Sequence, residues 1–147
     1  MASDSPARPG RGAPARAVTH VVALVVAAGR GVRMGGPVPK QYQTLGGRPV
    51  LAHTVARLAG HPRVAQVVVV ISPDDGGRAA AILPPGTPHV TGGATRAQSV
   101  AAGLAALPEA AGHALIHDAA RPLVPDGVID RVIDALGARD AAAPAVA

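Results

Sequence analysis

Residues 21–40 read VVALVVAAGRGVRMGGPVPK, and this stretch decides the fold. Its first half is a continuous apolar run, which is typical of a strand buried on both faces of a parallel sheet. The glycines that follow let backbone N–H groups turn inward and stabilise an anion. Arg33 and Lys40, the only lysine of the chain, add positive charge. The stretch therefore predicts a buried strand followed by a phosphate-binding loop.

The apolar run has a second interpretation, as the core of a signal peptide. Arginines precede it, and Ala27-Ala28-Gly29 resembles a cleavage site of small residues. The glycine-rich loop directly after the run favours the strand. The run is also too short to cross a bilayer, so we expect no membrane partner.

Strand and helix patterns alternate along the rest of the chain. Further strands are predicted at residues 64–71, 89–91 and 114–117, and helices at residues 49–59, 78–83, 95–107 and 125–136. This alternation predicts an α/β fold with a Rossmann-like, mostly parallel sheet and helices on both faces. We expect residues 1–19, rich in Pro, Gly and Arg, to form a disordered tail, and residues 20–147 to form one domain.

The composition limits which partners and which kinds of site the protein can have. The net charge is +5, but part of it lies in the tail, and aromatic residues make up 1% of the chain. Few side chains can therefore stack on bases, and we expect no nucleic-acid partner. The chain has no cysteine, which excludes disulfides and thiolate metal sites and agrees with a cytoplasmic location.

Three loops follow predicted strands and should meet at the carboxyl edge of the sheet: Gly29 to Lys40, Gly92 to Ser99 and Asp118 to Pro122. Asp118 is a candidate ligand for Mg²⁺, which takes one or two carboxylates plus substrate phosphates. Each of the later loops also has an ordinary interpretation. Thr95 could be a helix cap with Ser99 in solvent, and Asp118 could form a turn salt bridge with Arg121.

Residues 27–34 (AAGRGVRM), together with Pro39-Lys40-Gln41-Tyr42 and with His117 to Pro122, resemble the 2-C-methyl-D-erythritol 4-phosphate cytidylyltransferase family. The resemblance runs from about Val21 to the end of the chain. It implies a nucleotidyltransferase domain of the nucleotide-diphospho-sugar transferase type. It also implies an enzyme that moves a cytidylyl group from CTP to methylerythritol phosphate and releases pyrophosphate, in non-mevalonate isoprenoid synthesis with Mg²⁺.

The resemblance also assigns roles to residues of this chain. Arg33 and Lys40 become the catalytic cations, and Asp118 becomes the metal ligand. The implied nucleotide-binding residues are Ala27, Ala28, Gly29, Gly31, Gly92, Gly93, Ser99, Ala119 and Arg121. The chain departs from the family at Ala94, where an acidic residue associated with the ribose is common. His117 is expected to be structural, because an ionised acceptor phosphate needs no proton removed.

Alternatives remain open at this point. A ribitol-5-phosphate cytidylyltransferase shares the architecture and differs in its acceptor, and other nucleotidyltransferases fit the motifs less well. The third alternative is a non-catalytic CTP-binding fragment, because the resemblance places acceptor contacts and a dimer-forming arm in residues expected beyond Ala147. The family otherwise suggests a homodimer.

Overall fold

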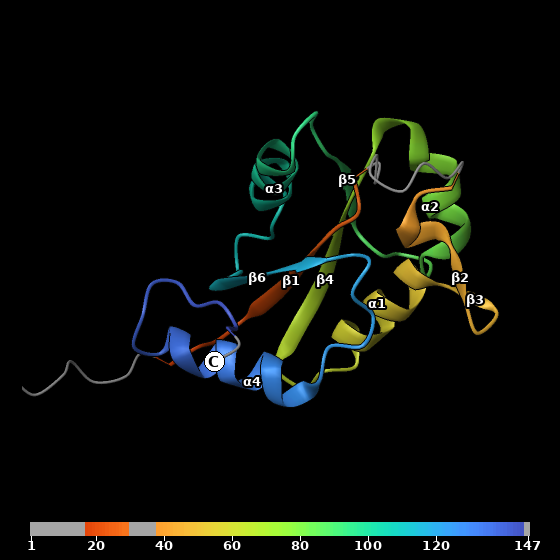
Figure 1. Ribbon diagram of the computed structural model, residues 1–147. Helices are drawn as coiled ribbons and strands as arrows, with labels where there is room; N and C mark the ends of the chain where they lie inside the picture. The colour runs from red at the N-terminus through yellow and green to blue at the C-terminus, as the bar shows by residue number, and fades with distance from the viewer. Residues whose placement is uncertain (1–16, 30–37, 146–147) are drawn as a thin grey trace, which may run out of the picture.

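A computed structural model of the chain describes residues 17–29 and 38–145. Four parallel strands form the central sheet in the order β5-β4-β1-β6 (Figure 1). They are β1 (Val21–Val26), β4 (Val64–Ile71), β5 (His89–Thr91) and β6 (His113–Asp118). The expected parallel α/β architecture is confirmed, and the apolar run is the central strand β1.

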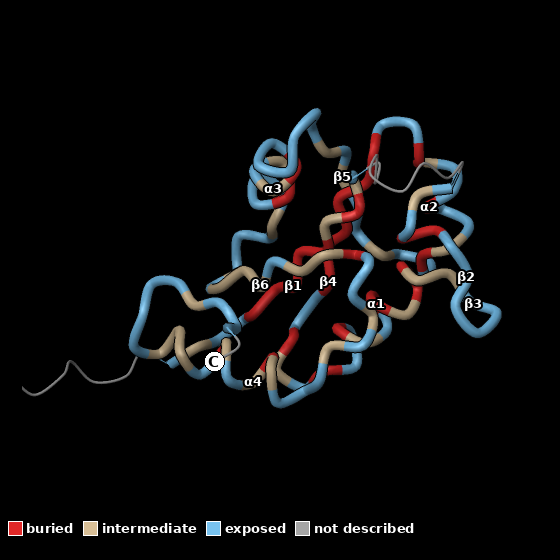
Figure 2. The backbone as a smooth tube through the Cα atoms, viewed as in Figure 1, coloured by how far each residue is buried: buried red, intermediate tan, exposed pale blue. Residues whose placement is uncertain are grey.

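Helices lie on both faces of the sheet (Figure 1). Along β1, Val21, Ala23 and Val25 pack into one core with residues of α1, α2 and α4, whereas Val22 and Leu24 face the opposite way. The helices are α1 (Val50–Ala59), α2 (Gly76–Ile82), α3 (Arg96–Ala105) and α4 (Asp126–Leu136). Figure 2 shows the buried residues concentrated in β1 and β4, as expected for strands covered on both faces.

The packing of α3 corrects one sequence expectation. In the predicted helix at residues 95–107, the spacing of Val100, Leu104 and Leu107 would place them on one apolar face, but Leu104 is 43% exposed and Gly103 is buried. A Cβ atom on Gly103 would lie 2.5 Å from Leu24 Cδ1. The helix therefore lies against the sheet at a glycine, because a side chain there would separate the two layers.

Two 3-10 helices and a hairpin were not predicted, and α2 starts earlier than expected. The 3-10 helix η2 (Lys40–Tyr42) follows the first loop, and a hairpin joins β2 (Thr44–Leu45) to β3 (Arg48–Pro49). Gly46 and Gly47 turn this hairpin at φ values of 57° and 80°, which glycine adopts without strain. A second 3-10 helix, η3 (Pro73–Asp75), leads into α2, which begins at Gly76 rather than at Arg78.

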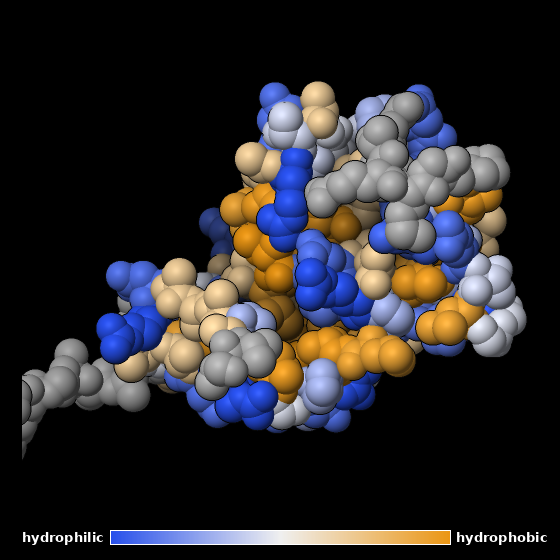
Figure 3. Space-filling model, in the orientation of Figure 1, coloured by the Kyte–Doolittle hydropathy of each residue, from blue (hydrophilic) through white to orange (hydrophobic). Residues whose placement is uncertain are grey.

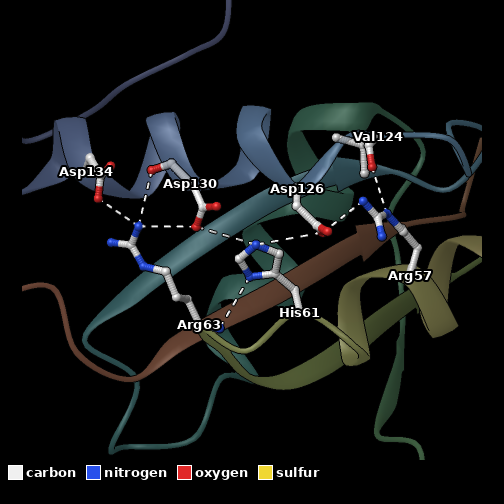
Figure 4. Close-up of polar contacts among 7 residues, drawn as sticks. All are labelled: Arg57, His61, Arg63, Val124, Asp126, Asp130 and Asp134. Carbon is white, nitrogen blue, oxygen red and sulfur yellow. Dashed lines mark hydrogen bonds and ion pairs between the residues drawn. The ribbon is translucent and has the colours of Figure 1, made fainter.

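Salt bridges join α4 to the turn between α1 and β4, near the amino end of β4 (Figure 1). The side chain of His61, 1% exposed, places Nε2 at 3.5 Å from Asp130 Oδ1. Arg63 Nη1 contacts Asp130 and Asp134 at 3.3 and 2.7 Å, as Figure 4 shows. These contacts hold α4 against the turn that precedes β4, at the amino end of that strand.

A helix that crosses a membrane must be long and apolar, and none within the described residues meets both requirements.

Candidate functional site

The site lies where the strand order reverses, between the carboxyl ends of β1 and β6. From β1 the chain passes to β4 and β5 on one side and then returns to β6 on the other. Ligands of open α/β sheets bind in the crevice at such a switch point. Val26 pairs with Asp118 in the parallel register, so the end of β1, just before the first loop, lies beside Asp118.

Two arginines hold Asp118. Arg96 Nη2 donates to Oδ1 at 3.0 Å, and Arg121 Nε donates to Oδ2 at 3.1 Å. Partial burial alone would raise the pKa of Asp118, but the Arg96 hydrogen bond and the charges of Arg96 and Arg121 outweigh it and lower the pKa below its ordinary value. Asp118 therefore presents a full negative charge at neutral pH.

Arg96 was missed by the sequence reasoning, whereas the turn salt bridge between Arg121 and Asp118 was anticipated. Arg96 is the first residue of α3 and lies in the second loop, which was read for its glycines and Ser99. The signal that could have found Arg96 is its position, because it follows a predicted strand at the same edge of the sheet as Asp118. The ion pair joins the second loop to the third.

Thr95 and Ser99 order the second loop. Thr95 caps α3 through its side chain and forms a capping box with Gln98, so its interpretation as a cap is confirmed. The interpretation of Ser99 as a solvated residue is wrong, because Ser99 is only 2% exposed. Its Oγ accepts a hydrogen bond from the Gly93 N–H at 3.2 Å and lies 3.0 Å from the Thr95 carbonyl oxygen.

The second loop meets the residues after β1 at Gly92. A Cβ atom at this position would lie 2.6 Å from Ser99 Oγ and 2.8 Å from Ala28 Cβ. The Gly92 N–H also donates to the Ile71 carbonyl at 2.8 Å. Only a glycine allows the backbone after β5 to approach both Ala28 and Ser99, which places the start of the second loop against the residue that precedes the first.

Gln41 closes the base of the first loop. Its buried side-chain amide donates to the carbonyl oxygens of Ala27 and Gly29 at 2.7 and 2.9 Å. Lys40, which is exposed, is thereby brought back to the end of β1. Sequence reasoning used Gln41 only as part of a motif and missed this contact. Gly31 and Arg33, also predicted for this loop, lie outside the described residues.

Tyr42 anchors the other side of η2. Its ring is buried beneath the Arg78 guanidinium, 5.2 Å from the ring centroid, and Arg78 pairs with Asp75 at 2.9 Å. Burial, with the charge of Asp75 in addition, raises the pKa of Tyr42. These contacts hold the segment carrying Lys40 against the start of α2.

The third loop is fixed by its backbone. The buried Ala119 donates its N–H to the Val26 carbonyl at 3.1 Å, and the Arg121 N–H donates to the Asp118 carbonyl at 3.1 Å. His117 Nε2 lies 2.9 Å from the Arg121 carbonyl oxygen. The predicted residues Ala119 and Arg121 therefore lie beside Asp118 in one turn.

An apolar hollow of about 820 Å³ extends from this turn along β6 to α4. Arg96, Asp118 and Arg121 form its polar end, and Leu115, Ile129 and Val132 are among its apolar walls. Figure 3 shows apolar side chains gathered along β6, between α3 and α4.

The donor set at this edge suits a cation completed by ligand oxygens. Among the described residues, no three or more His, Cys, Asp or Glu side chains come together as a metal-binding group. Asp118 supplies one ionised carboxylate, and Mg²⁺ is commonly held by one or two carboxylates together with phosphates and water. Asp118 thus fits a hard divalent cation that arrives with a phosphate ligand.

Comparison with known proteins places these features in a family. The model of the family described as IspD, 2-C-methyl-D-erythritol 4-phosphate cytidylyltransferase, matches residues 21–147. The bifunctional enzyme IspD/IspF of Rhodospirillum rubrum is 55% identical over 134 residues, which cover 88% of this chain and 35% of that protein.

Solved structures show the same fold. The 4-diphosphocytidyl-2C-methyl-D-erythritol synthase of Anaerococcus prevotii is 29% identical with a TM-score of 0.68, covering 82% of this chain and 52% of that one. A manganese complex of Rv0371c from Mycobacterium tuberculosis is 26% identical with a TM-score of 0.61, covering 82% and 61%. The chain spans about a third of the bifunctional relative and about half of the synthase. The chain belongs to the 2-C-methyl-D-erythritol 4-phosphate cytidylyltransferase family.

Proposed function

We propose that this protein transfers a cytidylyl group from CTP to 2-C-methyl-D-erythritol 4-phosphate and that the described residues form the CTP side of the site. The observation that carries the proposal is the convergence, at the switch point, of the residues that follow β1, the second loop and the third loop. Ala28, Gly92 and Ser99 are in contact there, and Arg96 links the second loop to Asp118. Family membership supports the choice of nucleotide and acceptor.

In the proposed reaction, a phosphate oxygen of methylerythritol phosphate attacks the α-phosphorus of CTP. A new P–O bond forms, the bond to the bridging oxygen of the β-phosphate breaks, and pyrophosphate leaves with that electron pair. The acceptor phosphate is already ionised, so no general base is needed. The work of the protein is therefore to position the reactants and to stabilise charge.

Lys40 and Arg33 are the proposed cations for the triphosphate. Lys40 presents a compact charge on a flexible stem, which suits a single phosphate oxygen, and Gln41 returns it to the base of the loop. Negative charge moves onto the leaving pyrophosphate during the reaction, so cations placed there stabilise the transition state more than the ground state.

Gly92, Gly93 and Ser99 are the proposed site for the cytidine. This assignment is supported by the close packing of the backbone after β5, where hydrogen bonds already orient Ser99 Oγ and the Gly93 N–H. Ala27, Ala28, Gly29 and Gly31 are proposed to line the phosphate loop. Ala119 and Arg121 complete the nucleotide site beside Asp118.

Asp118 is the residue proposed to hold a divalent cation, and Mg²⁺ is the proposed ion. When bound, the cation would supply positive charge at the α-phosphate. Arg96 and Arg121 occupy the two Asp118 oxygens in this structure. We propose that they hold the carboxylate ionised and in place for the cation.

The test offers CTP and Mg²⁺ to the chain, with methylerythritol phosphate or ribitol 5-phosphate as acceptor, and measures CTP affinity by calorimetry and pyrophosphate release. We expect CTP binding that depends on the cation, and transfer only to methylerythritol phosphate. Preference for ribitol phosphate would identify the related activity, and CTP binding without transfer would identify a binding role.

Lys40→Ala tests the triphosphate role directly. Loss of one such donor should lower the transfer rate on the order of 100-fold or weaken CTP binding. The matched control is Arg48→Ala, which removes an exposed cation from the hairpin after η2 and should leave both unchanged. Full activity of Lys40→Ala would contradict the assignment.

A further inference from the structure

Two side chains of α1 reach the segment that joins β6 to α4. Thr54 and Arg57 lie about one helical turn apart, and each bonds to a different end of residues 119–126. Asp118 immediately precedes this segment, and Arg121 lies inside it. The sequence motifs single out neither Thr54 nor Arg57, because both lie in a helix far from the three loops along the chain.

Thr54 holds the first end. Its side chain is fully buried, and its hydroxyl donates to the Ala119 carbonyl at 2.7 Å. The Val50 carbonyl lies farther away, at 3.2 Å, and a hydroxyl has one proton to donate. Because the Ala119 N–H already bonds to the Val26 carbonyl of β1, both sides of this residue are fixed.

Arg57 holds the second end. Its Nε donates to the Val124 carbonyl at 2.8 Å, and its Nη2 pairs with Asp126 Oδ1 at 2.8 Å (Figure 4). The planar guanidinium thus binds the backbone just before α4 and the first residue of that helix with two different nitrogens. The segment between Ala119 and Asp126 has both of its ends fastened to one rigid helix.

We propose that Thr54 and Arg57 are positioning residues that set the turn carrying Asp118 and Arg121. The inference rests on the proposed role of Asp118 in binding CTP with a divalent cation. Neither residue needs to touch the nucleotide, because they act through the backbone of residues 119–126. Asp118 is fixed by β6 on one side and, through Ala119, by α1 on the other.

The first arm of the test needs no ligand. Thr54→Val keeps the shape of the side chain but leaves the buried Ala119 carbonyl without its donor, whereas Thr54→Ser keeps the hydroxyl. We expect amide hydrogen exchange at Arg121, whose N–H closes the turn, to accelerate on the order of tenfold in Thr54→Val and to stay near wild type in Thr54→Ser. Arg57→Ala, at a half-exposed position, should also accelerate it.

The second arm measures CTP binding with Mg²⁺. Loss of a group that orients a metal ligand typically weakens binding on the order of 10- to 100-fold, so Thr54→Val should fall toward that range and Thr54→Ser should recover. Val64→Ala is the control for lost stability, because it removes buried methyl groups at the amino end of β4, away from the turn. It should change neither readout.

Each outcome decides one question. If Thr54→Val and Arg57→Ala leave Arg121 exchange no faster than in Val64→Ala, the positioning role is wrong, whatever happens to CTP. If exchange accelerates but CTP affinity does not change, the turn is held by α1 but does not govern the site, which also overturns the proposal. If the wild-type chain does not bind CTP, the proposed function fails, and the exchange arm still shows whether α1 sets the turn.

Discussion

Asp118 illustrates how much a single carboxylate depends on its neighbours. Its position at the end of a strand was predictable from the short apolar run Ala114-Leu115-Ile116 that precedes it. The arginine at position 96 was not, because its contact crosses from one loop to another and depends on how β5 and β6 are placed. Sequence reasoning therefore found the proposed metal ligand and one of its two arginine partners.

The lowered pKa of Asp118 leads to a prediction for acid stability. A carboxylate with a depressed folded-state pKa stabilises the fold above its unfolded pKa, about 4, and this contribution is lost as pH falls through the folded value. Asp118→Asn should therefore lose less unfolding free energy than wild type between pH 6 and pH 3. Urea denaturation across this range is the measurement.

The control for this comparison is Glu109→Gln, which removes an exposed carboxylate from the loop between α3 and β6. It should follow the wild-type curve more closely than Asp118→Asn does. Parallel curves for wild type and Asp118→Asn would mean that Arg96 and Arg121 contribute nothing to the folded state.

At the scale of elements, the strands were easier to predict than the helix faces that pack against the sheet. The bounds of β1 and β4 follow from long runs of mainly apolar residues that end at turn residues, and those of β5 from a short segment between Pro88 and Gly92. The buried face of α3 did not follow, because Ser99 and Gly103 carry it and neither is apolar in a periodicity count. The spacing of hydrophobic residues cannot predict a buried helix face that consists of a glycine and a serine.

The close packing at Gly92 leads to a prediction about the position of the second loop. Gly92→Ala would force its methyl group against Ser99 and Ala28, so the second loop must shift away from the first. We expect a loss of about 1–3 kcal/mol in the free energy of unfolding, as for an overpacked core site. Calorimetric titration should also show CTP binding weakened relative to wild type.

Gly77→Ala is the matched control. Gly77 lies in α2, and a Cβ atom there meets nothing within 4 Å. This substitution should therefore stabilise the protein by about 0.4–1 kcal/mol and leave CTP binding unchanged. Equal behaviour of the two alanine variants would show that the close approach at Gly92 carries no energetic weight.

At the scale of the whole molecule, the proposed site and the contacts that hold α4 lie at opposite ends of the strands. The second and third loops are joined at the carboxyl ends by Arg96 and Asp118, whereas His61 and Arg63 bind α4 near the amino end of β4. The sequence pointed to the proposed site because glycines and charges follow the strands there. The role of His61 could not be predicted, because its acidic partners, Asp126 and Asp130, come from a helix more than sixty residues later in the chain.

His61→Ala tests this separation. The imidazole is almost fully buried against α4, so its removal leaves a cavity and unpartnered groups and should cost about 1–3 kcal/mol of unfolding free energy. Affinity for CTP should not change. Chemical denaturation and calorimetry on the same sample give both values.

Arg63→Ala is the contrasting variant at the same end of the molecule. Its pairs with Asp130 and Asp134 lie at the surface, where such interactions contribute less than about 1 kcal/mol. A loss as large as that of His61→Ala would show instead that the surface charges, rather than the buried imidazole, hold α4.

The sheet order has a consequence for how the chain acquires this site. β1 is synthesised first among the strands, yet one of its neighbours, β4, follows a helix and the other, β6, emerges only after β5 and α3. Closing such long loops is entropically costly and slows folding. During synthesis, β1 and β4 can pair before β6 has emerged from the ribosome. We therefore expect the central pair of strands to form before Asp118 reaches Val26 at the switch point.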